Sequence, residues 1–155
     1  MTEITEALNE QQITDARGLF RDYEAWLGMS LCFQSFEEEV ATLPGRYARP
    51  GGRLYVAYIE AEPVGCIALR EIAPGTCEMK RLYLREAARG KGIGVRLIDQ
   101  VIVDAKKIGY ERMRLDTYPP KMGKAVSLYE AHGFSEIPAY YDNPHDGVMY
   151  MEKIL

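Results

Sequence analysis

A glycine-rich stretch at residues 89–94 constrains this chain more than any other feature. It reads Arg-Gly-Lys-Gly-Ile-Gly, follows an apolar run at residues 79–84 and precedes a helical pattern at residues 95–108. Glycine at every second position lets the backbone adopt positive φ values and lets a ligand approach it closely. The amides of such a turn, at the N-terminus of a helix, favour an anion through hydrogen bonds and the helix dipole. The sequence therefore predicts a strand, a phosphate-binding turn and a helix, in that order.

Two common phosphate motifs do not fit this stretch. A Walker loop has Lys and then Ser or Thr after its second glycine, whereas Lys91 is followed by Gly92 and no hydroxyl is there to hold magnesium. A dinucleotide fingerprint has the spacing G-x-G-x-x-G, whereas residues 90–94 have the spacing G-x-G-x-G. A glycine turn that only reverses the chain direction is the remaining alternative.

The pattern Arg-x-x-Gly-x-Gly at residues 89–94 resembles the pyrophosphate loop of the GNAT superfamily, the acyl-CoA-dependent N-acyltransferases. Residues 80–84 (Lys-Arg-Leu-Tyr-Leu) and residues 127–134 (Ser-Leu-Tyr-Glu-Ala-His-Gly-Phe) also resemble signatures of this family, so that the resemblance covers residues 77–134. It implies an α+β (α/β) fold with a mixed, mostly antiparallel sheet, whose central parallel strand pair is splayed for CoA and whose two faces carry helices. Acetyl-CoA is the implied co-substrate.

Length and composition indicate one folded domain that covers residues 1–155. The chain of 155 residues is 47% hydrophobic and 27% charged, which is ordinary for a globular protein. No apolar run approaches the roughly 20 residues that span a bilayer. The acidic N-terminus also lacks the apolar core of a signal peptide. We therefore expect a cytoplasmic protein that does not act on a membrane.

Charge is distributed unevenly along the chain. The net charge is −4, but residues 78–96 carry six cations and two acids, a local net charge of +4 that leaves −8 elsewhere. A basic island in an acidic chain suits a small polyanionic ligand such as CoA, and the overall negative charge argues against nucleic acid as a partner.

The cysteines and histidines do not indicate a metal site. Cys32, Cys66 and Cys77 are odd in number and widely spaced, unlike a disulfide framework or a zinc ribbon. We expect three reduced and mostly buried thiols. His132 and His145 cannot make a metal site without help from carboxylates, so we expect no metal.

The N-terminal part is expected to be mainly helical. A strand is predicted within residues 1–12, and a helix capped by Thr14 or Asp15 should run to about Trp26. Ser35 and Glu38 would form a capping box for a short helix that ends at residue 43.

The remaining elements are predicted from hydrophobic periodicity and turn residues. They are strands at residues 54–59, 64–70 and 77–84, a helix at 95–108, a strand at 112–117, a helix at 121–132 and strands at 134–137 and 148–154. The strand at 112–117 should lie parallel to the strand at 77–84, because a helix crosses over between them.

The resemblance implies a binding site for the donor. Backbone amides of the glycine loop would bind the pyrophosphate of CoA, and the end of the preceding strand would bind the pantetheine arm. The implied cofactor-binding residues are Leu82, Tyr83, Leu84, Arg89, Gly90, Lys91, Gly92, Ile93 and Gly94. One departure is Met122, which stands where many family members have an asparagine that helps to hold the cofactor arm.

Tyr129 is the candidate general acid. It matches the tyrosine of the family signature, which often faces the sulfur of CoA. A phenol with a pKa near 10 is protonated at neutral pH and can donate its proton to a thiolate. The alternative is a tyrosine that only packs on an amphipathic helix.

Glu78 is the candidate general base. It lies on the strand that carries a catalytic glutamate in the histone-modifying members of the family. Strand periodicity puts Glu78, Lys80, Leu82 and Leu84 on one face unless a bulge intervenes. A partly dry cleft would raise the pKa of this carboxyl. The alternatives are a salt bridge from Glu78 to Lys80 or Arg81, and deprotonation of the amine through ordered water.

The acceptor site is expected to form between the early helices and a late loop. The candidate substrate-binding residues in the loop at residues 138–148 are Tyr140, Tyr141 and Asn143. Aromatic residues of the early helical region could either line the acceptor site or belong to the core; they are Tyr23, Trp26 and Phe33.

Together these features predict an N-acetyltransferase that moves an acetyl group from acetyl-CoA to a primary amine of a small molecule or amino acid, by direct transfer in a ternary complex. The alternatives are a protein lysine or N-terminal acetyltransferase and a non-catalytic acyl-CoA-binding module. A closed pocket under the loop at residues 138–148 would favour a small molecule, and an open groove would favour a protein. Whether the chain forms a homodimer is left open.

Overall fold

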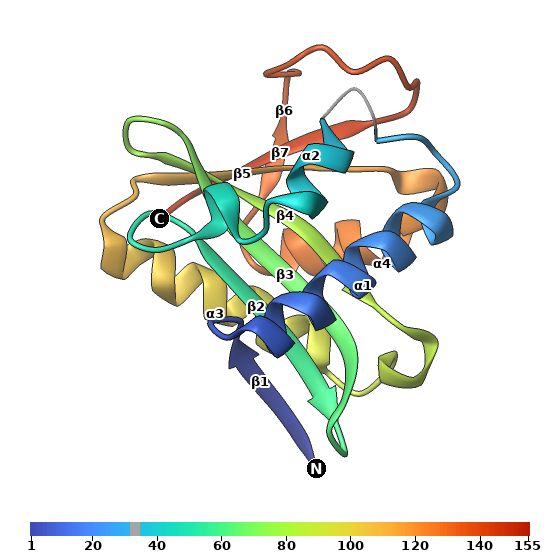
Figure 1. The fold of residues 1–155 in the computed structure, drawn as a ribbon. Coiled ribbons are helices and arrows are strands. Elements are labelled where there is room, and N and C mark those ends of the chain that lie inside the picture. Colours follow the sequence, from blue (N-terminus) through green and yellow to red (C-terminus); the bar gives the residue numbers. More distant parts are fainter. Residues whose placement is uncertain (32–34) are drawn as a thin grey trace.

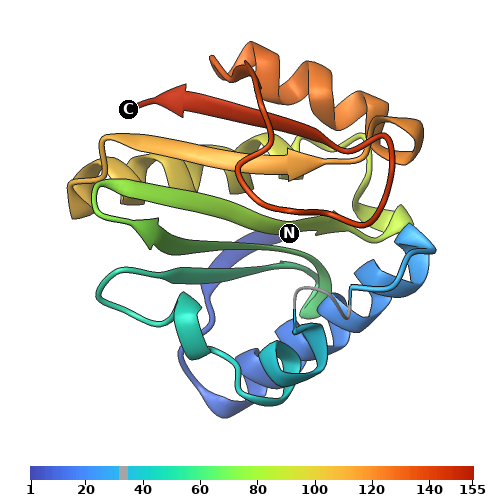
Figure 2. The same cartoon turned by 90° about the horizontal axis from the view of Figure 1, so that it is seen from above.

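The computed structural model describes residues 1–31 and 35–155 and contains a seven-stranded sheet with helices on both faces (Figure 1, Figure 2). The strand order across the sheet is β1-β2-β3-β4-β5-β7-β6. The strands are β1 (Thr2–Glu6), β2 (Arg53–Ile59), β3 (Glu62–Ala73), β4 (Thr76–Leu84), β5 (Arg112–Thr117), β6 (Ser135–Ile137) and β7 (Met149–Ile154). The helices are α1 (Glu10–Leu27), α2 (Phe36–Ala41), α3 (Ile93–Ile108) and α4 (Pro119–Ala131).

β4 and β5 form the parallel pair of an otherwise antiparallel sheet, as predicted. Residues 76–78 of β4 pair with residues 112–114 of β5. β4 then continues to Leu84 and β5 to Thr117, but within the described residues they share no further pair. The two strands therefore separate in the middle of the sheet. The main chain of β4 beyond residue 78 is left without a partner on that side.

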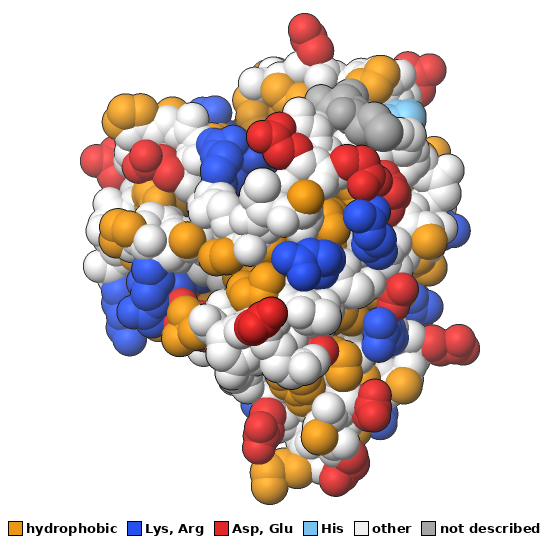
Figure 3. Space-filling model, in the orientation of Figure 1, with side chains coloured by type: hydrophobic (Ala, Val, Ile, Leu, Met, Phe, Trp, Pro, Cys, Tyr) orange, Lys and Arg blue, Asp and Glu red, His pale blue; other side chains and the backbone are white. Residues whose placement is uncertain are grey.

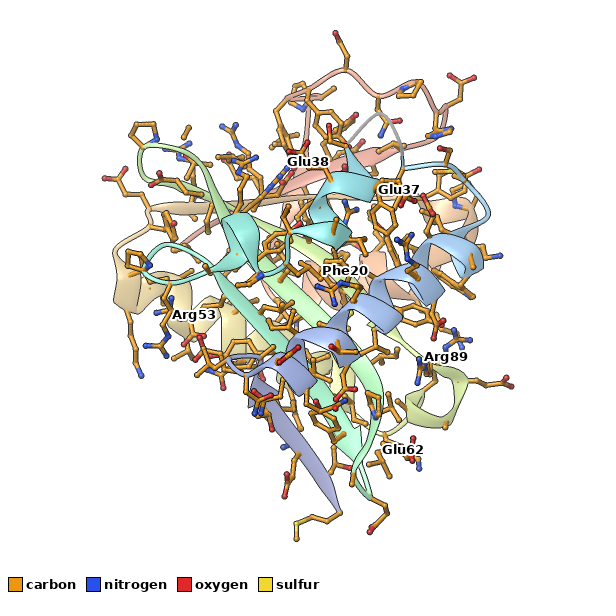
Figure 4. The ribbon with its side chains drawn as sticks, viewed as in Figure 1. Phe20, Glu37, Glu38, Arg53, Glu62 and Arg89 are labelled. Atoms are coloured by element: carbon orange, nitrogen blue, oxygen red, sulfur yellow. The ribbon has the colours of Figure 1, made fainter. Side chains whose placement is uncertain are left out.

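Two hydrophobic clusters hold the helices against the sheet. α1 and α2 pack on one face, over Ala68 of β3, and Phe20 of α1 is fully buried there (Figure 4). α3 and the second half of α4 pack on the other face, over Ile67 and Leu69. Successive side chains of a strand point to opposite faces, so β3 contributes to both clusters in turn.

A β-bulge interrupts the alternation of β4. Ala68 of β3 pairs with Lys80, but Cys66 pairs with Tyr83, so that β4 contains one residue more than β3 over this stretch. The backbone of Arg81 has a positive φ of 61°. The sequence put Glu78, Lys80, Leu82 and Leu84 on one face unless a bulge intervened; the bulge is present, and it turns Leu82 and Leu84 into the α3 cluster.

The first two helices begin differently from the prediction. α1 begins four residues earlier than Thr14, because Asn9 caps it: the Asn9 side chain accepts a hydrogen bond from the Gln12 amide (2.8 Å), and the Gln12 side chain accepts one from the Asn9 amide (3.1 Å). Ser35 is the N-cap of α2, but its φ of 56° and the lack of a side-chain cap show that the predicted capping box with Glu38 does not form.

Two other boundaries also moved. α4 begins at Pro119 rather than Lys121, since proline is well tolerated in the first turn of a helix, and it is kinked at Met122. The β2–β3 turn consists of Glu60 and Ala61, both with positive φ, so the predicted four-residue turn is two residues shorter.

In the described part of the chain, each helix is too short or too polar to cross a lipid bilayer. Cys66 and Cys77 are buried free thiols, as predicted, and burial raises the pKa of the Cys77 thiol to about 12. Cys32 lies outside the described residues.

The capping box of α1 makes a testable contribution to stability. Replacing Asn9 with Ala removes the acceptor for the Gln12 amide and should lower the free energy of unfolding by about 1 kcal/mol. Urea denaturation followed by circular dichroism measures this difference. Gln11→Ala, an exposed substitution in the same turn, is the control and should change stability by much less. Equal effects of the two substitutions would contradict the assignment of the cap.

Candidate active site

The glycine loop forms the predicted turn between β4 and α3. Gly90 and Gly92 each have a φ of +74°, which L side chains rarely adopt. Gly92 is the N-cap of α3, and within the described residues no side chain caps its first amides. Gly94 is buried in the first turn of α3, where a Cβ would make only an ordinary contact with the Cδ1 atom of Leu84 (3.5 Å). The loop therefore presents backbone amides at a helix N-terminus.

A cleft borders the point where β4 and β5 separate. It has two adjoining lobes, which we name the Tyr129 lobe and the Asn143 lobe. The Tyr129 lobe is lined by Tyr23, Met79, Lys80, Arg81, Leu82, Asp116, Met122 and Tyr129. The Asn143 lobe is lined by Tyr23, Leu27, Met29, Leu31, Arg81, Asp116, Thr117, Tyr118, Met122, Asn143 and Val148. Because Tyr23, Arg81, Asp116 and Met122 line both lobes, the cleft is continuous.

Only some of the predicted site residues line this cleft. Those that do are Leu82, Tyr129, Asn143 and Tyr23, together with Met122 at the position of the expected asparagine. Those described residues that lie outside its lining are Glu78, Tyr83, Leu84, Trp26, Tyr140 and Tyr141, and all the predicted residues of the glycine loop, namely Arg89, Gly90, Lys91, Gly92, Ile93 and Gly94. Phe33 lies outside the described residues.

Tyr129 is buried on α4 and borders the lobe formed by the β4 bulge. Its ring packs edge-on against Phe134, with 5.9 Å between the ring centroids. Its hydroxyl makes no hydrogen bond with the described residues, and it lines the cleft. Burial raises the pKa of Tyr129, so the hydroxyl keeps its proton at neutral pH. The side chain can therefore donate a proton into the Tyr129 lobe.

The β4 bulge is fixed by contacts of Arg81. Its guanidinium forms two hydrogen bonds to Glu39 (2.9 and 3.0 Å) and lies 5.2 Å from the centroid of the Phe36 ring. The Cys66 thiol donates a hydrogen bond to the Arg81 carbonyl (3.2 Å). These contacts hold the bulge while the main chain of residues 79–82 borders the Tyr129 lobe.

Glu78 does not have the environment predicted for a base. It is buried, its Oε1 accepts from Arg70 (2.9 Å) and its Oε2 accepts from the Tyr140 hydroxyl (2.5 Å). Burial alone would raise the pKa of Glu78, but the charges of Lys80 and Arg70 and these hydrogen bonds together lower it. The expected rise in pKa is wrong, and the ion pair is made with Arg70 instead of Lys80 or Arg81.

The loop at residues 138–148 is anchored to the sheet by its tyrosines. Tyr140, Tyr141 and Tyr150 form an edge-to-face cluster with centroid distances of 5.4 Å. The Asn143 side chain donates to the Tyr141 hydroxyl (3.1 Å). The His145 ring contacts the Ser30 carbonyl (3.0 Å), which links the loop to the segment after α1. The loop and this segment both contribute to the lining of the Asn143 lobe.

Asp116 is a cleft residue that sequence analysis missed. It lies near the end of β5, borders both lobes and accepts a hydrogen bond from the Tyr141 hydroxyl. A carboxylate at the carboxyl end of a parallel strand was a usable signal, because ligands often bind at that end of a sheet. Lys80, also missed, is buried beside it, and burial lowers the pKa of its ammonium group.

Trp26 joins the glycine loop to α1 and α4. The guanidinium of Arg89 lies 5.5 Å from the Trp26 ring centroid, and the ammonium of Lys121 lies 5.3 Å from it. Figure 4 shows Arg89 in the loop after β4, beside α1. Trp26 therefore packs between the glycine loop and the hydrophobic cluster under α1, which agrees with the core alternative of the prediction and not with the acceptor-site alternative.

The surface over α1 and α2 carries charges of both signs. In Figure 3, Lys and Arg side chains on this face are interspersed with Asp and Glu. Several of them are paired, for example Arg21 with Glu37 (3.1 Å) and Arg85 with Asp22 (2.6 Å). This is the pattern of a mixed, solvated surface.

Comparison with known proteins identifies relatives along most of the chain. The model of the acetyltransferase (GNAT) family matches residues 13–134. An uncharacterized N-acetyltransferase of Schizosaccharomyces pombe is 39% identical over 143 residues, which make up 91% of this chain and 87% of that protein.

Solved structures share the fold. An acetyltransferase of the GNAT family from Staphylococcus aureus Mu50 has a TM-score of 0.82 at 20% identity, with 99% of both chains covered. A PaiA N-acetyltransferase from Thermoplasma acidophilum, solved in complex with coenzyme A, has a TM-score of 0.72 at 22% identity, with 100% of this chain and 99% of that chain covered.

The buried ion pair of Glu78 predicts a pH dependence of stability. Because the pKa of Glu78 is lowered in the folded state, its contribution is fully present above the ordinary value of 4.5 and is lost as the pH falls through the lowered value. Glu78→Gln should therefore lower the free energy of unfolding by about 3 kcal/mol at pH 7. The difference in this free energy between the variant and the wild type, the stability gap, should become smaller below pH 4.5.

Denaturant unfolding at several pH values measures this gap. Glu136→Gln, at an exposed position of β6, is the control and should show no such narrowing. A gap that stays constant down to acid pH would mean that Glu78 is not held as a charged partner of Arg70.

Proposed function

The chain belongs to the GNAT family of acetyltransferases, and on that premise we propose its reaction: transfer of an acetyl group from acetyl-CoA to the primary amine of a small molecule or amino acid, directly within a ternary complex. One observation carries this proposal. Tyr129 and the part of β4 that has no partner on the β5 side line one continuous cleft with a second lobe beside them.

The residues present suit acetyl-CoA, the acetyl donor of GNAT enzymes. The uncapped amides of α3 after Gly92, with Arg89 and Lys91 beside them, would bind the pyrophosphate. The main chain of β4 around Leu82 has no partner on the β5 side and would pair with the pantetheine arm. When bound, the donor supplies the acetyl group as an activated thioester.

Tyr129 is the proposed general acid. Its burial keeps the hydroxyl protonated well above neutral pH, while a free thiol has a pKa near 8.5. Because burial makes this phenol a weaker acid than a thiol, its hydroxyl would act by donating a hydrogen bond to the sulfur as negative charge develops there, with proton transfer following, and this makes thiolate loss easier. Its place on α4, against Phe134, sets the direction in which the hydroxyl points.

For Glu78 we favour a positioning role. Both carboxylate oxygens are bound by Arg70 and Tyr140, and the lowered pKa makes this group a weaker base. A general-base role for Glu78 remains a prediction that would require these partners to release it. We propose that ordered water carries the proton away from the amine, and that Glu78 holds Tyr140 and thereby the loop at residues 138–148.

One contact beside the Asn143 lobe supports a small acceptor over a protein. The loop at residues 138–148 and the segment after α1 approach each other at His145 and Ser30. A lysine side chain of a protein substrate would need an open groove at this place. We further propose that residues 1–155 act as a single domain in the cytoplasm, where the buried thiols Cys66 and Cys77 would stay reduced.

Donor binding gives the first test. Isothermal titration calorimetry of the wild type with acetyl-CoA should show a saturable one-to-one event of micromolar strength. Gly92→Val should show no detectable binding, because a β-branched residue cannot adopt the positive φ of this position. Gly18→Ala, at an open position of α1, is the control and should bind normally. Normal binding by Gly92→Val would mean that the loop is only a chain-reversing turn.

Turnover gives the second test and separates an enzyme from a silent acyl-CoA-binding module. With acetyl-CoA and a panel of primary amines, Tyr129→Phe should lower kcat by about 100-fold, because it removes the proton donor but keeps the ring. The calorimetric affinity for acetyl-CoA should stay the same. Tyr110→Phe is the matched control, because it removes the hydroxyl of another buried tyrosine, one that donates a hydrogen bond to the Gly51 carbonyl. Its kcat should stay close to that of the wild type. Unchanged kcat in Tyr129→Phe would exclude the acid role.

A further inference from the structure

We propose that Asp116 binds the ammonium group of the acceptor and that the acceptor is a small primary amine with an apolar body. This inference rests on the proposed acetyl transfer, and it narrows the acceptor from amines in general to one chemical class. It assigns a recognition role to a residue that the family resemblance did not mark.

Asp116 occupies the junction between the two parts of the cleft. It lies beyond the last β4–β5 pair and lines both the Tyr129 lobe and the Asn143 lobe. Among the described lining residues it is the single carboxylate. Tyr23, Arg81 and Met122 also line both lobes, but an amine that passes from the Asn143 lobe to the thioester finds its one carboxylate partner at Asp116, which attracts a cation.

The carboxylate is oriented and retains one open acceptor position. Its Oδ2 accepts a hydrogen bond from Tyr141, whose hydroxyl also accepts one from Asn143. Its Oδ1 accepts no hydrogen bond from the described residues. An ammonium group at Oδ1 would complete a charge-assisted hydrogen bond without any rearrangement of the loop.

The cations of the cleft do not offer an equivalent place for an acceptor carboxylate. Arg81 is already bound through two nitrogen atoms by Glu39. Lys80 lies in the field of two acids, Asp116 and Glu78, which interact with its ammonium group. A carboxylate-bearing acceptor would instead meet the negative charge of Asp116 at the junction.

The rest of the Asn143 lobe indicates the body of the acceptor. Apolar side chains from the end of α1, the following segment and the late loop line it, namely Leu27, Met29, Leu31 and Val148. A second charged group placed against these side chains would lose its hydration without gaining a partner. An uncharged, apolar group would instead gain from burial there.

The test compares cationic and neutral acceptors of similar size. Phenethylamine is an ammonium ion at pH 8, whereas phenylhydrazine is uncharged, and the acetylated product of each can be measured by chromatography. Asp116→Asn keeps an acceptor oxygen for Tyr141 but removes the charge. It should lower kcat/KM for phenethylamine by about 10- to 100-fold and for phenylhydrazine by less than about threefold.

Two variants and one binding measurement control this comparison. Asp142→Asn removes an exposed carboxylate of the loop at residues 138–148. It should leave kcat/KM unchanged for both phenethylamine and phenylhydrazine. Asp116→Glu keeps the charge and should restore the preference for phenethylamine over phenylhydrazine. The affinity of Asp116→Asn for acetyl-CoA, measured by calorimetry, should equal that of the wild type, because the substitution lies outside the glycine loop.

The acceptor class is tested on the wild type with 1,4-diaminobutane and β-alanine, which add a second cation or a carboxylate. Phenethylamine should have the higher kcat/KM. A higher kcat/KM for 1,4-diaminobutane or β-alanine than for phenethylamine would overturn the inference. An equal loss of kcat/KM for phenethylamine and phenylhydrazine in Asp116→Asn would also overturn it. Either result would leave the proposed acetyl transfer intact. If the wild type binds acetyl-CoA but acetylates none of these compounds, or does not bind it, the proposed function itself fails.

Discussion

The separation of β4 from β5 is the constraint on which the rest of the site depends. A positive φ at Arg81 costs about 1 kcal/mol or more for a residue with a side chain. The double hydrogen bond to Glu39, the Phe36 ring and the Cys66 thiol offset this cost. The main chain of β4 beyond residue 78 stays paired with β3 but has no β5 partner, and residues 79–82 border the cleft on that side. The contacts with Glu39 and Phe36 also hold α2 against β4.

Two carboxylates on neighbouring strands have opposite relations to the cleft. Glu78 is enclosed, with both oxygens bound by the protein, and its charge stabilises Arg70 and the Tyr140 hydroxyl. Asp116 has one oxygen bound and lines both lobes. The degree of burial does not explain why Glu78 and Asp116 differ. The difference lies in the number of hydrogen bonds that the protein already makes to each carboxylate. A carboxylate with a remaining acceptor position can still bind a ligand.

The sequence predicted best the features that short-range signals determine. The glycine loop, the end of α3 at Gly109 and the bounds of β5 follow from local residues, and they match the structure. The start of α1 was missed because the pair Asn9 and Gln12 outcompetes the later cap candidates. The bulge of β4 could not be read locally, since Arg81 is held by Glu39, 42 residues away. The environment of Asp116 likewise depends on Tyr141, 25 residues away.

The Asn143 lobe, the proposed acceptor site, is built largely from segments outside the sheet. Its walls come from residues 27–31 and from the loop at residues 138–148, while the donor side uses the glycine loop and β4. The stretch matched by the family model ends at residue 134, before that loop begins. Residues 27–31 lie within that stretch, and Leu27 and Leu31 are also part of the buried core. Substitutions that alter the lining of this lobe should therefore disturb the fold less when they fall in the loop than when they fall beside α1.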